Sequence, residues 1–317
     1  MVEPVNFLNS QGARLHGTLH TPSKPRPQAP AVILLSPGVK MRVGPGRLYV
    51  PLTDLLNSLG FTVLRFDFFG LGDSEGQLHE SLLIDIYNHV EVGRNVDDTL
   101  CAIRWMRETH GYSSFILGGL CGGATTAALA AERDPSIRFL LCIGLAITLS
   151  SDAATPAKYL TRVELDSRRQ KYFRRLLEPK SWIRLLTFQS EYGVIWRSMK
   201  KVIFKERATP APEAAAITGE HMENANPLFP PAYFSFLQRG GKALLIFSEK
   251  DRLPSEFDEK FATPYAKRLE PYQGQIRSHI VASANHVLSM PEWRQDMLSV
   301  TQDWVENQVA QVLSPGL

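Results

Sequence analysis

The sequence predicts an α/β fold, in which helices flank a mostly parallel sheet and a helical cap insertion comes late in the chain. Three observations lead to this prediction. Short apolar runs alternate with stretches of helical periodicity, which is typical of βα units. Several runs are apolar at every position, as in strands that helices cover on both faces. The alternation is interrupted once, between about residues 149 and 239.

The predicted strands begin with a hairpin and continue as buried apolar runs. Residues 5–8 and 14–20 flank Ser10-Gln11-Gly12, a turn sequence, and apolar residues alternate along the second strand. Residues 31–35 contain no polar side chain, which indicates a strand covered on both faces. The further strands are predicted at 61–66, 114–118, 139–147, 243–247 and 276–281.

Helical periodicity fills the intervals between these strands. Residues 48–59 carry apolar side chains at helical spacing and stop before Gly60. Residues 95–108 are amphipathic, and an alanine-rich helix begins at 124–131. A closing helix is expected over 290–312. This order of elements favours a single sheet with helices on both faces.

The interruption is also helical in character. Apolar side chains recur at helical intervals between 182 and 203, whereas 206–226 is rich in Ala, Pro and Glu and is expected to be a loop. The predicted domains are therefore a first part of the core at 1–148, a helical cap insertion at 149–239 and a second part of the core at 240–317. The 317 residues, 44% hydrophobic and 21% charged, suit one large globular core.

Cys121 lies in Gly119-Leu120-Cys121-Gly122-Gly123, between a predicted strand and a predicted helix. The pattern G-x-nucleophile-x-G marks a sharp strand-to-helix turn that exposes a reactive side chain, and small neighbours make room for it. A helix N-terminus also stabilises a thiolate. The alternative is a buried structural cysteine beside a glycine-rich packing contact.

Two residues complete a candidate catalytic set with Cys121. A thiol of ordinary pKa, about 8.5, is mostly protonated at neutral pH, so it needs a neighbouring base. Asp251 and His286 each follow a predicted strand of the parallel sheet, so both are expected at the same edge as Cys121. His286 is the expected acid and base, and Asp251 orients its ring. Asp251 has two rivals, Glu249 and Asp258, and its alternative role is that of an ordinary surface turn residue.

Acyl transfer also requires donors for an oxyanion. We expect one from the backbone N–H of Gly122, directly after the nucleophile, and a second from Val39 in the loop after residues 31–35. That loop could instead be a plain turn. Arg42 and Arg47 follow it and are candidate ligands for a substrate carboxylate or phosphate, with an ion pair to Asp67 or Asp73 as the alternative for these arginines.

The chain resembles the α/β-hydrolase superfamily over nearly all of its length outside the cap. Besides the elbow, residues 67–74 are similar to that superfamily's D-x-x-G-x-G-x-S turn. More narrowly, it resembles the cysteine-bearing hydrolases associated with exosortase A systems. The similar stretches are 40–47, 65–67, 72–76, 119–121, Asp251 and 255–257. The resemblance implies a Cys-Asp-His set, here Cys121, Asp251 and His286.

The function expected from these residues is acyl transfer from an ester or thioester through an acyl-cysteine, as in a hydrolase or thioesterase. One alternative is an acyltransferase that moves an acyl group from CoA or a carrier protein to an alcohol or amine. A further alternative is a non-catalytic scaffold that binds an acyl ligand. No cofactor is expected, and no Cys/His cluster has the spacing of a metal site.

Charge and cysteine content bear on partners and location. Residues 151–210 hold 14 Lys/Arg and 6 Asp/Glu, although the whole chain has a formal net charge of only +3. This basic segment is either a solvated helix face, a docking site for an acidic carrier protein or phosphate-bearing acyl donor, or a contact for an anionic membrane. No nucleic-acid-binding motif accompanies it. Three cysteines, no signal peptide and no transmembrane segment favour a cytoplasmic protein.

Overall fold

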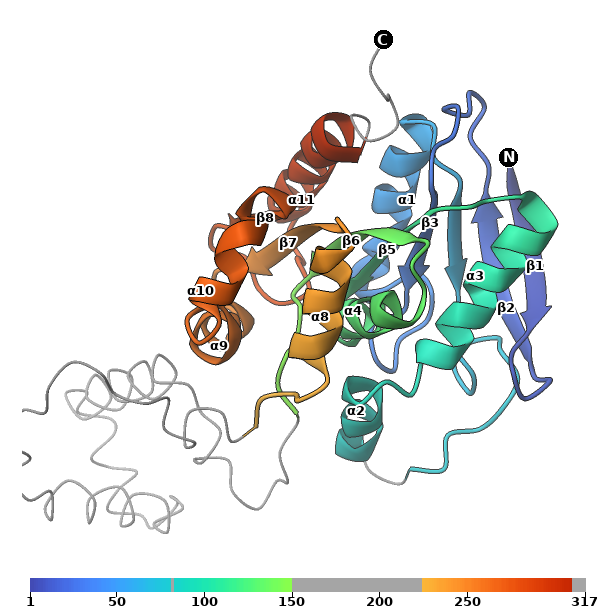
Figure 1. Ribbon diagram of the computed structural model, residues 1–317. Coiled ribbons are helices and arrows are strands. Elements are labelled where there is room, and N and C mark those ends of the chain that lie inside the picture. The colour runs from blue at the N-terminus through green and yellow to red at the C-terminus, as the bar shows by residue number, and fades with distance from the viewer. Residues whose placement is uncertain (81–82, 150–223, 310–317) are drawn as a thin grey trace, which may run out of the picture. The chain divides into compact units, whose positions relative to one another are not determined.

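A computed structural model describes residues 1–80, 83–149 and 224–309. Eight strands form one sheet in the order β1-β2-β4-β3-β5-β6-β7-β8 (Figure 1). The pairs β1–β2 and β2–β4 are antiparallel, and every other neighbouring pair is parallel. The strands are β1 (Val2–Leu8), β2 (Arg14–His20), β3 (Ala31–Leu35), β4 (Val63–Phe66), β5 (Phe115–Leu120), β6 (Ile137–Ile143), β7 (Lys242–Ser248) and β8 (Ile276–Val281). The predicted α/β fold is confirmed.

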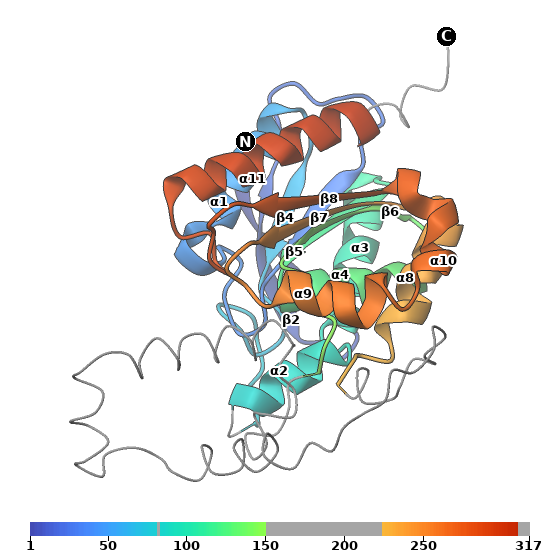
Figure 2. The ribbon, with the colours of Figure 1, turned by 90° about the vertical axis from the view of Figure 1, so that its left-hand side faces the viewer.

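Helices cover both faces of the sheet. The helices α1 (Tyr49–Ser58) and α11 (Pro291–Trp304) pack on one face, and α3 (Val96–His110), α4 (Gly122–Arg133) and α8 (Phe229–Gln238) pack on the other, as Figure 2 shows. The shorter helices are α2 (Leu83–Glu91), α9 (Leu253–Phe257) and α10 (Ala266–Leu269). Single 3₁₀ or π turns are η1 (Pro45–Arg47), η4 (Asp258–Ala262), η5 (Glu270–Gln275) and η6 (Val305–Val309).

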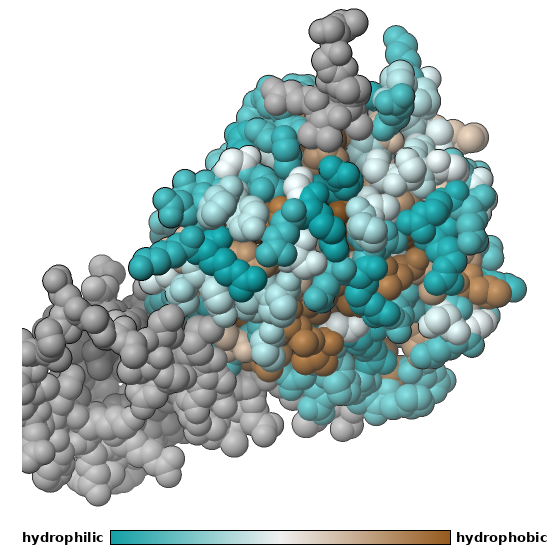
Figure 3. Space-filling model, viewed as in Figure 1, coloured by the Kyte–Doolittle hydropathy of each residue, from teal (hydrophilic) through white to brown (hydrophobic). Residues whose placement is uncertain are grey.

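The two helical layers divide the side chains of each central strand between two cores. In β3, Ile33 and Leu35 enter the core beneath α3 and α4, whereas Val32 and Leu34 enter the core beneath α1 and α11. Every residue of β3, β4 and β5 is buried. This double burial explains why the sequence shows continuous apolar runs rather than alternation. The outer surface, in contrast, is mostly hydrophilic on the face seen in Figure 3.

The β1–β2 hairpin forms as predicted, and its turn is held by one side chain. The Asn9 side-chain oxygen accepts hydrogen bonds from the backbone N–H groups of Gln11 and Ala13, both at 3.0 Å. Gly12 has φ +79°, a conformation that glycine adopts without strain. The hairpin places β2 against β4, and the sheet is extended by two antiparallel strands.

The predicted strand 139–147 was too long, and β6 ends at Ile143. The next residue, Gly144, has φ +54° and donates its N–H to the Ile246 carbonyl at 2.7 Å, so the chain turns there although apolar residues continue. The helix α2 was not predicted.

The helix α8 was not predicted either, and it lies within the predicted insertion 149–239. It packs against α4, and its aromatic residues Phe229, Tyr233 and Phe234 are buried in the same core as β5 and β6. The predicted helical stretch 182–203 lies outside the described residues. The predicted loop 206–226 also lies outside them as far as residue 223. The division into core and cap therefore stays a prediction.

Candidate active site

The structure brings three predicted residues together at the carboxyl edge of the sheet. Cys121 follows β5, Asp251 follows β7 and His286 follows β8. These three strands are parallel, with β5, β6, β7 and β8 adjacent in that order, so their carboxyl ends share one edge. Open α/β sheets carry their ligand sites at this edge.

Cys121 occupies a strained turn between β5 and α4. Its backbone has φ 54° and ψ −120°, a region that residues with a side chain rarely occupy and that costs of order 1–3 kcal/mol. Its N–H donates to the Ile143 carbonyl at 2.9 Å, and its carbonyl accepts from Ala124 and Thr125 as α4 begins. The turn leaves the thiol half-buried, between the strand and the helix N-terminus.

The glycines around Cys121 allow backbone segments to approach one another. A Cβ on Gly119 would lie 2.5 Å from the Gly123 carbonyl carbon, and one on Gly123 would lie 2.4 Å from the Leu35 carbonyl oxygen. Both distances are too short for real atoms. The glycines therefore let the elbow fold back on itself and pack against the end of β3.

His286 is bound to Asp251. The ring Nδ1 lies 2.5 Å from Asp251 Oδ2, and the two side chains are 39% and 11% exposed. The other carboxylate oxygen of Asp251 accepts the Arg252 N–H at 2.8 Å. This arrangement fixes the ring orientation and leaves Nε2 free to act on a neighbouring group.

The same ring is also a hydrogen-bonding partner of the Cys121 thiol. The bond to Asp251, followed by the bond to Cys121, raises the pKa of His286 to about 10, against the opposing effect of burial. The ring is therefore held in its protonated form at neutral pH. An imidazolium beside a thiol favours the thiolate, which is the nucleophilic form.

The rival carboxylates have other partners. Glu249 accepts the Ser283 N–H at 2.5 Å and pairs with Lys250 at 3.0 Å, and Asp258 accepts from the Thr263 hydroxyl at 3.2 Å. Only Asp251, of the three acids considered, contacts His286.

The other two cysteines, Cys101 and Cys142, are buried, and burial raises the pKa of Cys142 to about 12.

The loop that carries Val39 lies beside the elbow. A Cβ on Gly122 would be 3.4 Å from the Gly38 nitrogen, so the loop and the first turn of α4 are in close contact. The Val39 N–H makes no hydrogen bond within the described residues. Gly122 is the first residue of α4, where an N–H has no acceptor inside the helix. Both N–H groups are therefore available to an anion.

Tyr49, which the sequence analysis did not single out, holds the two central strands together behind Cys121. Its hydroxyl accepts the Leu120 N–H at 2.6 Å and donates to the Leu35 carbonyl at 2.8 Å. Burial raises its pKa well above the ordinary value, so the hydroxyl stays protonated. It fixes the residue before the nucleophile relative to the loop that carries Val39.

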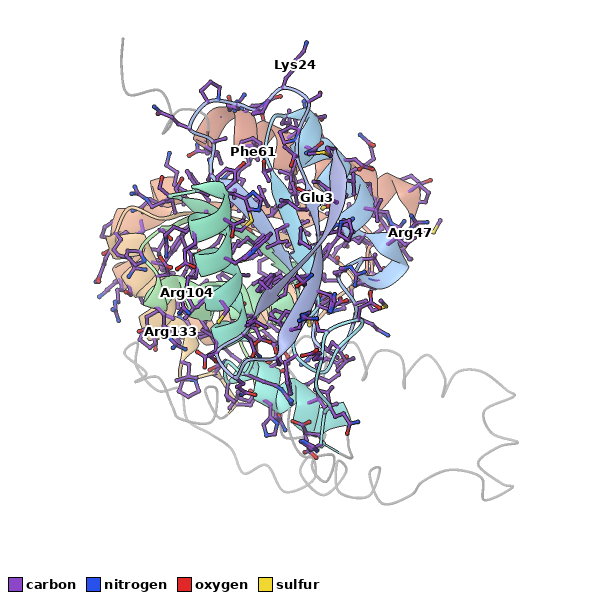
Figure 4. All side chains as sticks on the ribbon, turned by 90° about the vertical axis from the view of Figure 1, so that its right-hand side faces the viewer. Glu3, Lys24, Arg47, Phe61, Arg104 and Arg133 are labelled. Atoms are coloured by element: carbon purple, nitrogen blue, oxygen red, sulfur yellow. The ribbon has the colours of Figure 1, made fainter. Side chains whose placement is uncertain are left out.

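Arg42 forms an ion pair with Asp67 and Asp73, which the sequence analysis gave as the alternative to a role in substrate binding. Its guanidinium pairs with buried Asp67 and, at 2.7 Å, with exposed Asp73, while its N–H donates to Asp67 at 2.6 Å. Arg47 is exposed at the surface (Figure 4) and has no ion pair within the described residues. A role of either arginine in substrate binding stays a prediction.

The turn at residues 67–74 has a structural function that explains its pattern. A Cβ on Gly72 would lie 2.2 Å from Asp67 Oδ2, so only glycine allows the turn to close over this carboxylate. The Ser74 hydroxyl donates to the Asp67 carbonyl at 2.6 Å and accepts the His16 N–H at 2.9 Å. The motif thus joins β2, β4 and the Arg42 loop.

Two further searches cover the described part of the chain. Ranges 1–80, 83–149 and 224–309 contain no group of three His, Cys, Asp or Glu side chains that could hold a metal ion. Over the same ranges, no helix has the length and apolar character needed to cross a bilayer.

The family model for the alpha/beta hydrolase fold matches residues 42–257. This chain belongs to the α/β-hydrolase family. The match spans the Arg42 loop, the elbow and Asp251, and it covers more than half of the chain. None of the curated proteins matches the sequence.

Solved structures of low sequence identity share the fold. An esterase of Pyrococcus furiosus has a TM-score of 0.58 at 13% identity, covering 98% of this chain and 93% of its own. The esterase domain of a Rhodothermus marinus protein has a TM-score of 0.53 at 17% identity, covering 98% and 100%. A protein of unknown function from Agrobacterium tumefaciens has a TM-score of 0.54 at 17% identity, covering 98% and 97%.

Proposed function

We propose that this α/β hydrolase transfers acyl groups from esters or thioesters through an acyl-cysteine intermediate on Cys121. One observation carries the proposal: a single imidazole, His286, contacts both the Cys121 thiol and the Asp251 carboxylate. The two esterases that share the fold support a carbonyl substrate. The resemblance to cysteine-bearing hydrolases of exosortase A systems supports cysteine as the nucleophile.

In the acylation step, the Cys121 sulfur attacks the carbonyl carbon and forms a C–S bond. The carbonyl electrons move onto oxygen, where the N–H groups of Gly122 and Val39 stabilise the negative charge. The intermediate then collapses, the bond to the leaving alcohol or thiol breaks, and His286 gives the leaving group its proton from Nε2. The product is a thioester on Cys121.

Deacylation runs through the same groups in reverse. His286 takes a proton from water or from an acceptor alcohol or amine, whose oxygen or nitrogen attacks the thioester carbonyl. The tetrahedral intermediate collapses, the C–S bond breaks and the Cys121 thiolate is regenerated. Asp251 stabilises the imidazolium in both steps without taking up the proton. Hydrolysis is the function proposed, and transfer to an alcohol or amine differs from it only in the acceptor.

A comparison of turnover tests this proposal. The wild type is given p-nitrophenyl acetate and acetyl-CoA, each with and without an added alcohol or amine. We expect release of p-nitrophenol or CoA that the Cys121→Ala variant lacks and that the control Cys101→Ser retains. If the acetyl group is transferred only to water, the protein is a hydrolase. If the added alcohol or amine is acetylated, the protein is an acyltransferase. Equal turnover by wild type and Cys121→Ala would exclude the nucleophile, and no turnover at all favours the acyl-binding scaffold.

A further inference from the structure

The helix α2 packs directly on the elbow and on the loop that carries Val39. Val90 Cγ1 lies 2.8 Å from where a Cβ of Gly122 would be, and Tyr87 Cε1 lies 2.7 Å from where a Cβ of Gly38 would be. The two contacts are one helical turn apart, so one face of α2 covers both segments whose N–H groups are the proposed oxyanion donors.

The Tyr87 ring lies against Gly38 along one edge. Its Cδ1, Cε1 and Cζ atoms are all within 3.7 Å of the position that a Gly38 Cβ would occupy, and Gly38 itself has φ +53°. Cζ carries the hydroxyl, so the hydroxyl oxygen lies one bond beyond the ring atoms that rest on Gly38. Any side chain at position 38 would displace this ring.

The Tyr87 hydroxyl lies close enough to Cys121 for a charge on the sulfur to act on it. It makes no hydrogen bond within the described residues, and the side chain is half-buried. Burial raises the pKa of the phenol, and the nearby negative charge of Cys121 raises it further. The hydroxyl therefore keeps its proton throughout the neutral range, which a hydrogen-bond donor to an anion must do.

We propose that the Tyr87 hydroxyl donates a hydrogen bond to the carbonyl oxygen of the acyl group as negative charge develops on it. This inference rests on the proposed acyl transfer at Cys121. Tyr87 thus adds a side-chain donor to the N–H groups of Gly122 and Val39. Tyr49 has no such role, because both sides of its hydroxyl are used by Leu120 and Leu35.

The Tyr87→Phe variant tests the proposal, because it keeps the ring on Gly38 and removes only the hydroxyl. Two rates are measured at Cys121 for each protein. One is acylation by p-nitrophenyl acetate, which passes through an oxyanion. The other is alkylation by iodoacetamide, which does not. We expect Tyr87→Phe to slow acylation by roughly 100-fold, the usual effect of losing one oxyanion donor, and to leave alkylation unchanged.

Tyr265→Phe is the matched control, since this tyrosine is also half-buried and packs on Phe261 rather than on Gly38. We expect both of its rates to equal those of the wild type. Acylation of Tyr87→Phe at the wild-type rate overturns the role of Tyr87, and so does an equal slowing of acylation and alkylation. A wild type that is never acylated at Cys121 overturns the proposed function itself, a result distinct from the other two.

Discussion

The Tyr49 hydroxyl lies 2.6 Å from the Leu120 nitrogen, and this contact fixes the backbone directly before Cys121. The same hydroxyl donates to the Leu35 carbonyl, so one side chain from α1 joins the carboxyl ends of β3 and β5. These two ends carry the proposed oxyanion donors and the proposed nucleophile. The positions of the two parts of the site are therefore coupled through one buried phenol.

Replacing Tyr49 by Phe is expected to destabilise the protein and to slow acylation. The change leaves the Leu120 N–H and the Leu35 carbonyl without this partner in a buried place, at a cost of about 1–3 kcal/mol for an unsatisfied group. Urea unfolding measures the loss of stability. The control is Tyr112→Phe, which removes a hydroxyl bonded to Thr62 at 2.6 Å. If Cys121 in the Tyr49→Phe variant is acylated at the wild-type rate, the link that Tyr49 makes between β3 and β5 has no functional consequence.

Asp251→Asn is expected to lower the acylation rate by about 10²–10⁴-fold, the range typical of general acid–base catalysis. The amide no longer stabilises the imidazolium, so the pKa of His286 should fall from about 10 toward its ordinary value. NMR titration of the ring measures that fall. Glu249→Gln is the control, because Glu249 lies in the same loop and does not contact His286. An unchanged titration of His286 in Asp251→Asn would rule out this pairing.

The raised pKa of His286 also predicts how stability depends on pH. The folded protein holds this proton up to about pH 10, whereas the unfolded chain releases it near pH 6.5. The stabilisation is therefore fully present below pH 6.5 and is lost as the pH rises toward 10. Urea unfolding across this window should show a larger decline for wild type than for His286→Gln. Parallel declines in the two proteins would contradict the shift.

Gly123→Ala is expected to disrupt the elbow, because its Cβ would lie 2.4 Å from the Leu35 carbonyl oxygen. Overpacking of this kind costs typically 1–3 kcal/mol, and here the contact is with backbone, which moves less readily than a side chain. Thermal unfolding checks the effect. Gly274→Ala is the matched control, since nothing lies within 4 Å of its Cβ position. Equal stability of the two variants would mean that the close approach is not required.

Arg42→Ala separates the two roles considered for this residue. Removing the guanidinium leaves the fully buried Asp67 without its ion pair, and loss of one partner of a buried pair typically costs about 3–5 kcal/mol. Arg47→Ala, at an exposed arginine, should leave stability unchanged. A substrate ligand would instead show itself as a raised KM at normal stability. A raised KM with unchanged stability in Arg42→Ala would overturn the structural role of Arg42.

Much of the fold follows from local patterns in the sequence. A strand covered on both faces has no polar positions, and β3 was predicted on this ground with the bounds that the structure shows. The bounds of β8 also match the prediction, although this strand is mostly only partly buried and contains polar residues. The positions of Asp251 and His286 follow from the same reasoning, because a parallel sheet brings the ends of its strands to one edge. The fold class and this edge could therefore be derived without coordinates.

Other features depend on contacts between distant parts of the chain. The prolines Pro230 and Pro231 favour a break, yet they lie in the first turn of α8, where their missing N–H groups cost nothing. Tyr49 has the pattern of an apolar core residue, and its hydroxyl reaches Leu120 across 71 positions of sequence. Tyr87 lies on the short helix α2, which bears on the site only because it contacts Gly38 and Gly122. Local periodicity contains no signal for such contacts.

The most direct test of the central claim is mass spectrometry of the protein quenched in acid during turnover of p-nitrophenyl acetate. Acid slows deacylation, so an acyl-enzyme present during turnover is retained. We predict one acetyl group, located by peptide sequencing on Cys121 as a thioester that hydroxylamine removes. Active enzyme without an adduct on Cys121, or with its acetyl group on another residue, would contradict the account.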